Sequence, residues 1–352
     1  MTTQRPDFVL NRPGALIAAL PAILGFVPER SLVLVSLENG ALGAVMRVNL
    51  SGDLPDRVDH LAEVVAGAEP QAAIAVIIDA EGADCPARGE EHRRLCEALD
   101  DALARRGIVL RAAHVADRVA LGGRWHCPDE CGECGVVEDP FASPMAAAAV
   151  LDGRRLYARR ADLQGVVAVD NPSRSADLAV VVERRTAERG SAWREDSVGT
   201  RRRDVERAIA AAVSVAAGEL LSDDEVAELG CALTDAPVRD TFYALAVGEM
   251  AGAAESLWAV LVRTLPQPWR VEALVLLAFS AYARGDGPLA GISLEEALRC
   301  DPSHRMAEML DSALQSGMRP HDIQELAVSG YRIARQLGVQ LPPRLRLSRR
   351  AC

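Results

Sequence analysis

The stretch Gln71–Gly82, with the sequence QAAIAVIIDAEG, decides how the first half of the chain folds. Residues 72–78 are all apolar, and the run lies between Pro70 and Asp79. An apolar run of this length without polar alternation is typical of a strand buried on both faces. Such a strand needs covering elements on both sides, so the stretch predicts an internal strand of an α/β sheet.

Strand and helix patterns alternate around this run. The neighbouring elements that we expect are strands at residues 31–37, 41–50 and 108–115 and helices at residues 57–68 and 90–105. Asn39-Gly40 between the first two strands is typical of a β-hairpin turn. Gly122-Gly123 predicts a second turn, which folds the following segment back onto the sheet. Residues 1–168 are therefore predicted to form an α/β domain with a mixed sheet and a Cys-rich loop.

The second half of the chain changes its periodicity. From about Pro172 onward the segments between helix-breaking residues are helix-length and rich in Ala, Leu and Val. Ser222 followed by Glu225 is a capping box that marks a helix start. We predict an all-α domain over residues 169–341, followed by a basic tail at residues 342–352 that is expected to be mobile.

A weak repeat occurs within this helical half. With Pro302 as the closing proline of a 34-residue tetratricopeptide pattern, apolar or small residues fill the positions where that pattern requires them. These residues are Leu274, Leu277, Ala278, Ala290, Leu294 and Ala297. Ala281 stands where a Tyr is expected. The pattern predicts one or two tetratricopeptide-like hairpins, and a generic antiparallel bundle remains the alternative.

The charge balance excludes several classes of function. The 39 basic residues are all Arg, and with 50 acidic residues they give a net charge of -11. This balance argues against a broad nucleic-acid-binding face. The absence of Lys excludes mechanisms that need a Schiff-base or P-loop lysine. No apolar stretch reaches the ~20 residues that a membrane-spanning helix needs, so we expect no membrane partner.

Eight cysteines accompany a chain start that does not resemble a secretory signal, because Pro21 interrupts its apolar segment. We therefore expect reduced thiols in a cytoplasmic protein. Cys127, Cys131 and Cys134 are spaced so that they can converge on one Zn²⁺ with a structural role. The candidates for a fourth ligand are His126, His114, Cys85 and Cys96. The alternative is a set of reduced or redox-labile thiols in a turn.

Carboxylates follow the buried strand at Asp79, Glu81 and Asp84. Ligands of open α/β sheets bind beyond the carboxyl ends of strands, so these residues are candidates for a catalytic or Mg²⁺-binding pocket. The alternative is that they cap the next helix or are solvated. Glu90, Glu91 and His92 are interpreted as the polar first turn of that helix, so no catalytic His partner is expected.

Several segments together resemble a known family. They are LIAALPAILGFVPERSLVLVSL at residues 16–37, Trp125-His126-Cys127, FASPMAAAAVLDGR at residues 141–154, residues 160–163, Gly285-Asp286-Gly287 leading to Ala297, and Asp301-Pro302. The chain resembles the actinobacterial family known as domain of unknown function 4192 over about residues 10–320. The resemblance implies a GC-rich source but no particular activity, cofactor or site residue. The chain departs from the family at its cysteines, because other members carry adjacent Cys residues followed by Pro.

From these patterns we expect a cytoplasmic protein-interaction or regulatory module that binds a protein partner through its helical half. The alternative is an enzyme that acts on a small molecule in a carboxylate-lined pocket at Asp79.

Overall fold

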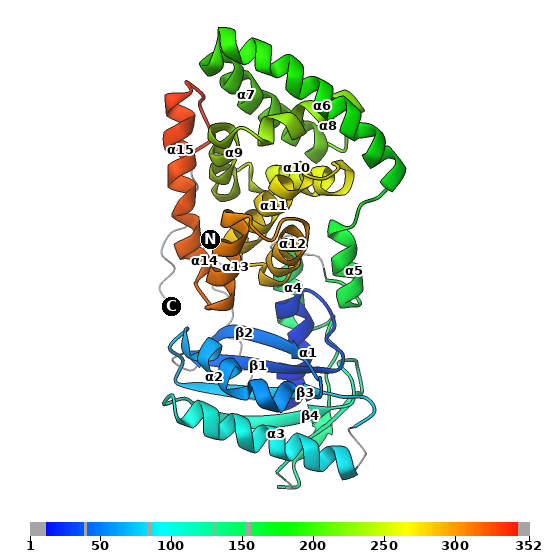
Figure 1. Cartoon of the computed structure of the whole chain (residues 1–352). Coiled ribbons are helices and arrows are strands. Elements are labelled where there is room, and N and C mark those ends of the chain that lie inside the picture. The colour runs from blue at the N-terminus through cyan, green and yellow to red at the C-terminus, as the bar shows by residue number, and fades with distance from the viewer. Residues whose placement is uncertain (1–11, 39–40, 83–85, 130, 152–155, 344–352) are drawn as a thin grey trace, which may run out of the picture. The chain divides into compact units, whose positions relative to one another are not determined.

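The computed structural model describes residues 12–38, 41–82, 86–129, 131–151 and 156–343. The chain divides into two compact units. The α/β unit comprises Met1–Leu163 with Gln315–Gly317, and the helical unit comprises Gln164–Leu314 with Met318–Cys352. A mixed sheet followed by helices confirms the fold class predicted from the sequence (Figure 1). No helix among the described residues is long and apolar enough to cross a membrane.

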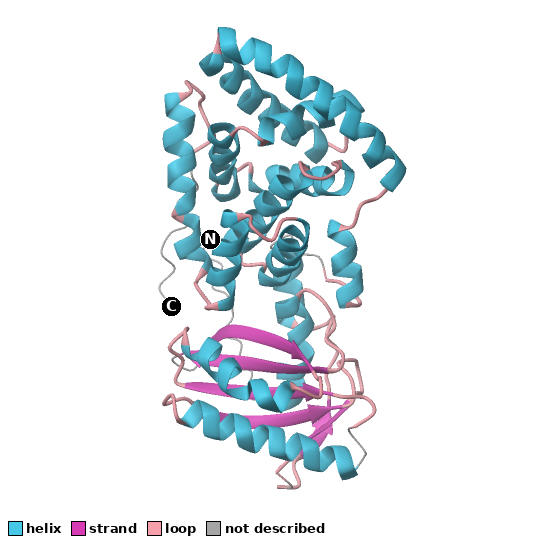
Figure 2. Ribbon diagram, in the orientation of Figure 1, coloured by secondary structure: helices cyan, strands magenta, loops and turns pink. Residues whose placement is uncertain are grey.

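The described strands of the α/β unit form one sheet in the order β2-β1-β3-β4-β5-β6 (Figure 2). Their bounds are β1 (Ser31–Glu38), β2 (Ala41–Asn49), β3 (Ala72–Ile78), β4 (Val109–Ala116), β5 (Arg124–His126) and β6 (Cys134–Val136). Strands β3 and β4 are parallel, and the other neighbouring pairs are antiparallel. Strands β1 and β2 pair as the predicted hairpin, whose turn at Asn39-Gly40 lies outside the described residues.

One face of the sheet is covered by helices α2 (Val58–Ala66) and α3 (Pro86–Ala104). Ala75 and Ile77 of β3 share a core cluster with Leu99 of α3, and all three are fully buried. Helix α3 connects the parallel strands β3 and β4, as a crossover between parallel strands requires. The amphipathic helices predicted before and after β3 in the sequence are therefore confirmed.

Helix α1 (Pro13–Leu24) packs on the side of the sheet opposite α2 and α3, beside α4 (Pro144–Leu151) (Figure 1). The sequence of α1 is apolar all round, which is typical of a buried helix. A Cβ atom at Gly14 would collide with the carbonyl oxygen of Val136 in β6. Only glycine therefore allows α1 to approach the edge of the sheet this closely.

The helical unit begins at the end of α5 (Arg160–Gln164), followed by the short helix η2 (Gly165–Val167). The helices that follow are α6 (Pro172–Glu195), α7 (Ser197–Ala216), α8 (Asp223–Leu233), α9 (Ala236–Phe242), η3 (Tyr243–Val247), α10 (Ala251–Thr264), α11 (Arg270–Arg284), α12 (Gly287–Cys300), α13 (Arg305–Gln315), α14 (Pro320–Gln324) and α15 (Leu326–Gln336). The predicted capping box at Ser222 and Glu225 is confirmed at the start of α8. Residues 344–352 of the predicted basic tail lie outside the described residues.

Helix α11 lies at the centre of this unit. Every residue from Ala273 to Ala283 is buried, with α10 and α12 as the main neighbours. Helices α11 and α12 form the hairpin predicted between Val271 and Pro302, and Gly285 ends α11 in the left-handed region at a φ of 87°. Helix α11 is therefore enclosed, and the outer helices form the surface of this unit.

Arg270, the first residue of α11, is a buried cation whose groups are satisfied by neighbouring segments. Its Nε donates to the carbonyl of Val262 at 2.8 Å, and its Nη2 donates to the carbonyl of Val167. Its Nη1 contacts Glu296 Oε1 of α12 at 2.6 Å. A buried charge is tolerated only with such partners, so Arg270 joins α10, α12 and η2 to the start of α11.

Replacing Arg270 should therefore destabilise the helical unit strongly. We expect the Arg270→Met variant to lose about 3 kcal/mol of unfolding free energy, because two carbonyls lose their donors and Glu296 loses a buried partner. The matched control is Arg299→Met, which removes an exposed arginine from the same carboxylate and should cost less than about 1 kcal/mol. Urea unfolding measures both variants, and equal losses would contradict this account of Arg270.

Candidate functional site

Asp79 and His92 form a buried pair at the carboxyl end of β3. Asp79 is 3% exposed and His92 is 4% exposed. His92 Nε2 lies 3.1 Å from Asp79 Oδ2, and because a carboxylate only accepts, Nε2 is the donor. The backbone N–H of Glu81 donates to Asp79 Oδ1 at 3.3 Å. The predicted strand-end carboxylate thus has a histidine partner that the sequence analysis did not expect.

The interpretation of His92 as part of a polar first turn was wrong. Helix α3 begins at Pro86, so His92 lies in its second turn and not in its first. His92, Leu95 and Leu99 follow one another at helical spacing, and this places all three on the buried face of α3. That spacing is the sequence signal that identifies His92 as a core residue.

The surroundings of the pair fix the state of His92. Burial lowers the pKa of His92, and the nearby Asp79 only partly opposes this effect. Arg88 Nη1 lies 3.8 Å from Asp79 Oδ2, so the positive charge of the guanidinium also faces this carboxylate. His92 Nδ1 is buried without a hydrogen-bond partner among the described residues. A Cβ atom at Gly82 would collide with Asp79 and lie 2.9 Å from His92 Cε1, so the backbone of Gly82 packs tightly against the pair.

The other predicted carboxylates do not add to this pair. Glu81 is exposed and contributes its backbone N–H to Asp79. Asp84 and Cys85 lie outside the described residues. Among the described residues, the end of β3 therefore holds the Asp79–His92 pair, with Arg88 beside it.

The cysteine loop brings together a different set of ligands from the three cysteines of the sequence pattern. The Sγ atoms of Cys127 and Cys131 and a carboxylate oxygen of Glu133 all lie within 4.8 Å of one another. His114 Nδ1 of β4 lies 3.8 Å from Cys127 Sγ. Burial, followed by the neighbouring Cys131, raises the pKa of the Cys127 thiol to about 12. Two sulfurs and a carboxylate within 4.8 Å of one another, with an imidazole nitrogen beside one of the sulfurs, are donor types that suit Zn²⁺.

The register of the β5–β6 ribbon explains why Cys134 is not in this group. Cys134 is paired with His126, and residues directly opposite each other in a sheet share a face. Successive residues of a strand point to opposite faces, so Cys127 and Cys134 lie on different faces. Cys96, the remaining described ligand candidate, belongs to the core beneath α3, where burial raises its pKa to about 12.

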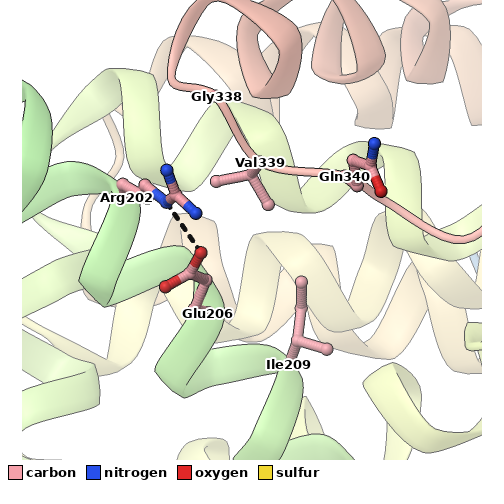
Figure 3. A pocket seen from close by; sticks show the side chains of 6 residues that line it. All are labelled: Arg202, Glu206, Ile209, Gly338, Val339 and Gln340. Carbon is pink, nitrogen blue, oxygen red and sulfur yellow. Dashed lines mark hydrogen bonds and ion pairs between the residues drawn. The ribbon is translucent and has the colours of Figure 1, made fainter.

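The helical unit has a surface hollow of about 440 Å³ (Figure 3). It is lined by Arg202, Glu206 and Ile209 of α7 and by Gly338, Val339 and Gln340, which follow α15. Arg202 Nε donates to Glu206 Oε1 at 2.8 Å across its rim, as Figure 3 shows. The hollow has no counterpart in the sequence analysis, because its two walls are more than a hundred residues apart in the chain.

The basic run Arg201-Arg202-Arg203, which contributes to this wall, is matched by acidic residues. Each of the three arginines lies within 4.0 Å of a carboxylate, on Asp235, Glu206 and Asp196 respectively. This part of the surface therefore lacks the excess of positive charge that binding to nucleic-acid phosphates requires.

Fold and sites together define a protein with an α/β unit that has a buried Asp–His pair and a thiol-rich edge, joined to a helical unit with a surface hollow. The chain belongs to the family described as Domain of unknown function (DUF4192), whose family model matches residues 13–321. This range includes the Asp79–His92 pair, the cysteine loop and the α7 wall of the hollow, but not residues 338–340. No curated protein and no solved structure matches the chain.

The lowered pKa of His92 predicts an acid-sensitive fold. The unfolded chain takes up the His92 proton near the ordinary pKa of about 6.5, and the folded chain takes it up only at lower pH. Stability from the neutral ring is therefore fully present above this pH and is lost as the pH falls, by at most about 1.4 kcal/mol per pH unit for one proton. The His92→Gln variant should lose less stability than the wild type between pH 7.5 and 5.5.

Urea unfolding at several pH values in this range measures the difference. His60→Gln is the control, because the His60 side chain is 64% exposed and should leave the wild-type slope unchanged. Equal slopes for the wild type and His92→Gln would show that His92 does not resist protonation in the folded state.

Proposed function

We propose that the chain is a cytoplasmic protein-interaction module that binds its partner through the hollow between α7 and residues 338–340. The observation that carries this proposal is the hollow itself, which places the apolar side chains of Ile209 and Val339 beside the charged pair Arg202–Glu206. Ile209 is half-buried, and Val339 is 6% exposed. A hollow of this size accepts one or two side chains of a partner segment.

Charge indicates what kind of segment fits. The chain has a net charge of -11, so a basic partner is attracted over long range. The Arg202–Glu206 pair is about half exposed on both sides, and an ion pair of this kind contributes less than about 1 kcal/mol. A cationic side chain of the partner can therefore pair with Glu206 in place of Arg202, with little loss of free energy. We infer a segment with a basic residue next to an apolar one, which covers Ile209.

Two further inferences accompany the proposal. The described cysteines Cys96, Cys127, Cys131, Cys134, Cys231 and Cys300 are free, and this supports a reducing cytoplasm. The use of Arg in place of Lys supports a GC-rich, actinobacterial source.

A photo-crosslinking amino acid at position 209 of the full chain, expressed in native cells, tests the proposed contact. We expect a specific protein adduct at this position and none at Val180, which is a 70% exposed apolar residue of α6. The Ile209→Asp and Glu206→Arg variants should lose the captured partner in a pull-down, and Val180→Asp should retain it. The same adduct from both positions, or capture that survives Ile209→Asp, would place the interface elsewhere.

A second candidate function is an enzyme that acts on a small anion at the Asp79–His92 pair. The observation that favours it is the buried, unpartnered Nδ1 of His92, which a carboxylate-held imidazole would offer as a general base. Arg88, whose side chain is 40% exposed, would supply a positive charge to a carboxylate or phosphate of the substrate.

Thermal shift with a panel of metabolites bearing carboxylate or phosphate groups tests this candidate. A true ligand should stabilise the wild type by about 2.7 kcal/mol at a concentration one hundred times its Kd. The same ligand should fail to stabilise the Asp79→Asn and Arg88→Gln variants. Ligand shifts that persist in both variants would exclude this pair as the substrate site.

A further inference from the structure

We propose that Cys127, Cys131 and Glu133 bind a Zn²⁺ ion, with His114 as the fourth ligand, and that this ion fixes the β5–β6 ribbon to β4. The proposal is independent of the interaction site in the helical unit, because all four residues belong to the α/β unit. It also differs from the ligand set that cysteine spacing predicts, since Glu133 and His114 replace Cys134.

Three ligand atoms, from Cys127, Cys131 and Glu133, are close enough to share one tetrahedral ion, and His114 approaches this group at Cys127. Zn–S bonds of about 2.3 Å and Zn–N bonds of about 2.0 to 2.1 Å place a sulfur and a nitrogen ligand about 3.6 Å apart, and two sulfur ligands about 3.8 Å apart. His114 Nδ1 and Cys127 Sγ are 3.8 Å apart. The ligand atoms of Cys127, Cys131 and Glu133 lie within 4.8 Å of one another, so small side-chain rotations bring them onto the ion.

Local contacts already hold the ligands near these positions. The His114 ring is 5% exposed and packs edge-to-face on Trp125, with ring centroids 5.2 Å apart. The backbone N–H of Cys127 donates to the carbonyl of Glu133 at 3.0 Å, and this fixes these two ligands opposite each other. The Cys131 N–H donates to Asp129 Oδ1 at 3.2 Å, which shapes the loop between them. Preorganisation of this kind lowers the entropic cost of binding an ion.

Sheet parity places three of the four ligands on one face. Cys127 and Trp125 are two residues apart in an extended segment and share a face. Trp125 is paired with Ala116 of β4, which shares its face with His114. Glu133 lies opposite Cys127 across the ribbon, so it is directed to the same side. Cys127 and Glu133 thus share a face with His114, and Cys131 lies within 4.8 Å of Cys127 and Glu133; a divalent cation would offset the negative charge of the carboxylate and of the thiols that lose their protons on binding it.

The role of the ion would be structural. Four protein ligands leave no open position for water, so the site does not offer the zinc-bound hydroxide of catalytic centres. Strands β5 and β6 have only three residues each, and strands this short contribute few ladder hydrogen bonds. An ion bound between β4, the end of β5 and the start of β6 would link these strands and add stability where the ladder hydrogen bonds are few.

Metal analysis of the full chain, expressed without a His tag and purified without chelators, tests the proposal. We expect about one Zn²⁺ per chain. The Cys131→Ser and Glu133→Gln variants should lose most of the bound Zn²⁺. The His114→Gln variant should lose its Zn²⁺ faster than the wild type during dialysis against a chelator. Cys134→Ser is the matched control, because it removes a neighbouring exposed thiol on the opposite face and should keep the full metal content.

Cobalt substitution gives a second, independent measurement. The Co²⁺-loaded wild type should show thiolate-to-metal charge-transfer absorption from two sulfur ligands, and the Cys134→Ser variant should show the same spectrum. Zinc content below a tenth of a mole per mole of chain, on the order of background for a tight site, would overturn the proposal. Equal metal loss in Cys134→Ser and Cys131→Ser would also overturn it, because the ligands would then be the three cysteines.

Discussion

Burial of β3 on both faces is the constraint on which the α/β unit depends. Ala75 and Ile77 of the strand pack in the core under α2 and α3, and Val76 and Ile78 are buried on its other face. The first polar residue after the strand, Asp79, is still inside the core. A buried carboxylate needs donors, which are the backbone N–H of Glu81 and the ring Nε2 of His92, and the Arg88 guanidinium adds a positive charge 3.8 Å away. The Asp–His pair is thus a direct consequence of how deeply the strand is buried.

Much of the fold could be predicted from the sequence because apolar periodicity reports burial directly. The run at residues 72–78 predicted β3, and the capping box predicted the start of α8. His92 was missed because its two acidic neighbours suggested a solvated turn, although its spacing to Leu95 predicts a core position. Polarity of neighbours in sequence is a weaker guide than helical spacing where a helix packs on a sheet.

The group formed by Cys127, Cys131 and Glu133 shows the limit of spacing rules. Cysteine spacing favoured Cys127, Cys131 and Cys134, but the register of a ribbon decides which side chains share a face. The pairing of His126 with Cys134 depends on the length of the turn between β5 and β6, and the sequence does not reveal this length. Glu133 carried no signal at all, since an acidic residue in a loop is usually solvated. The hollow beside α7 was equally unpredictable, because α15 must be in place before residues 338–340 meet Ile209.

Accessibility separates the three sites by the function that each can support. The Asp79–His92 pair is almost completely buried, and Gly82 packs directly against it, so the pair offers little surface to a partner or a substrate. The cysteine group lies at the edge of the sheet, where four ligands would consolidate short strands. The hollow of the helical unit is open, and its rim charges are only weakly satisfied by each other. Since binding a macromolecule requires exposed surface that gains partners on association, the hollow is the site that best supports a protein-interaction function.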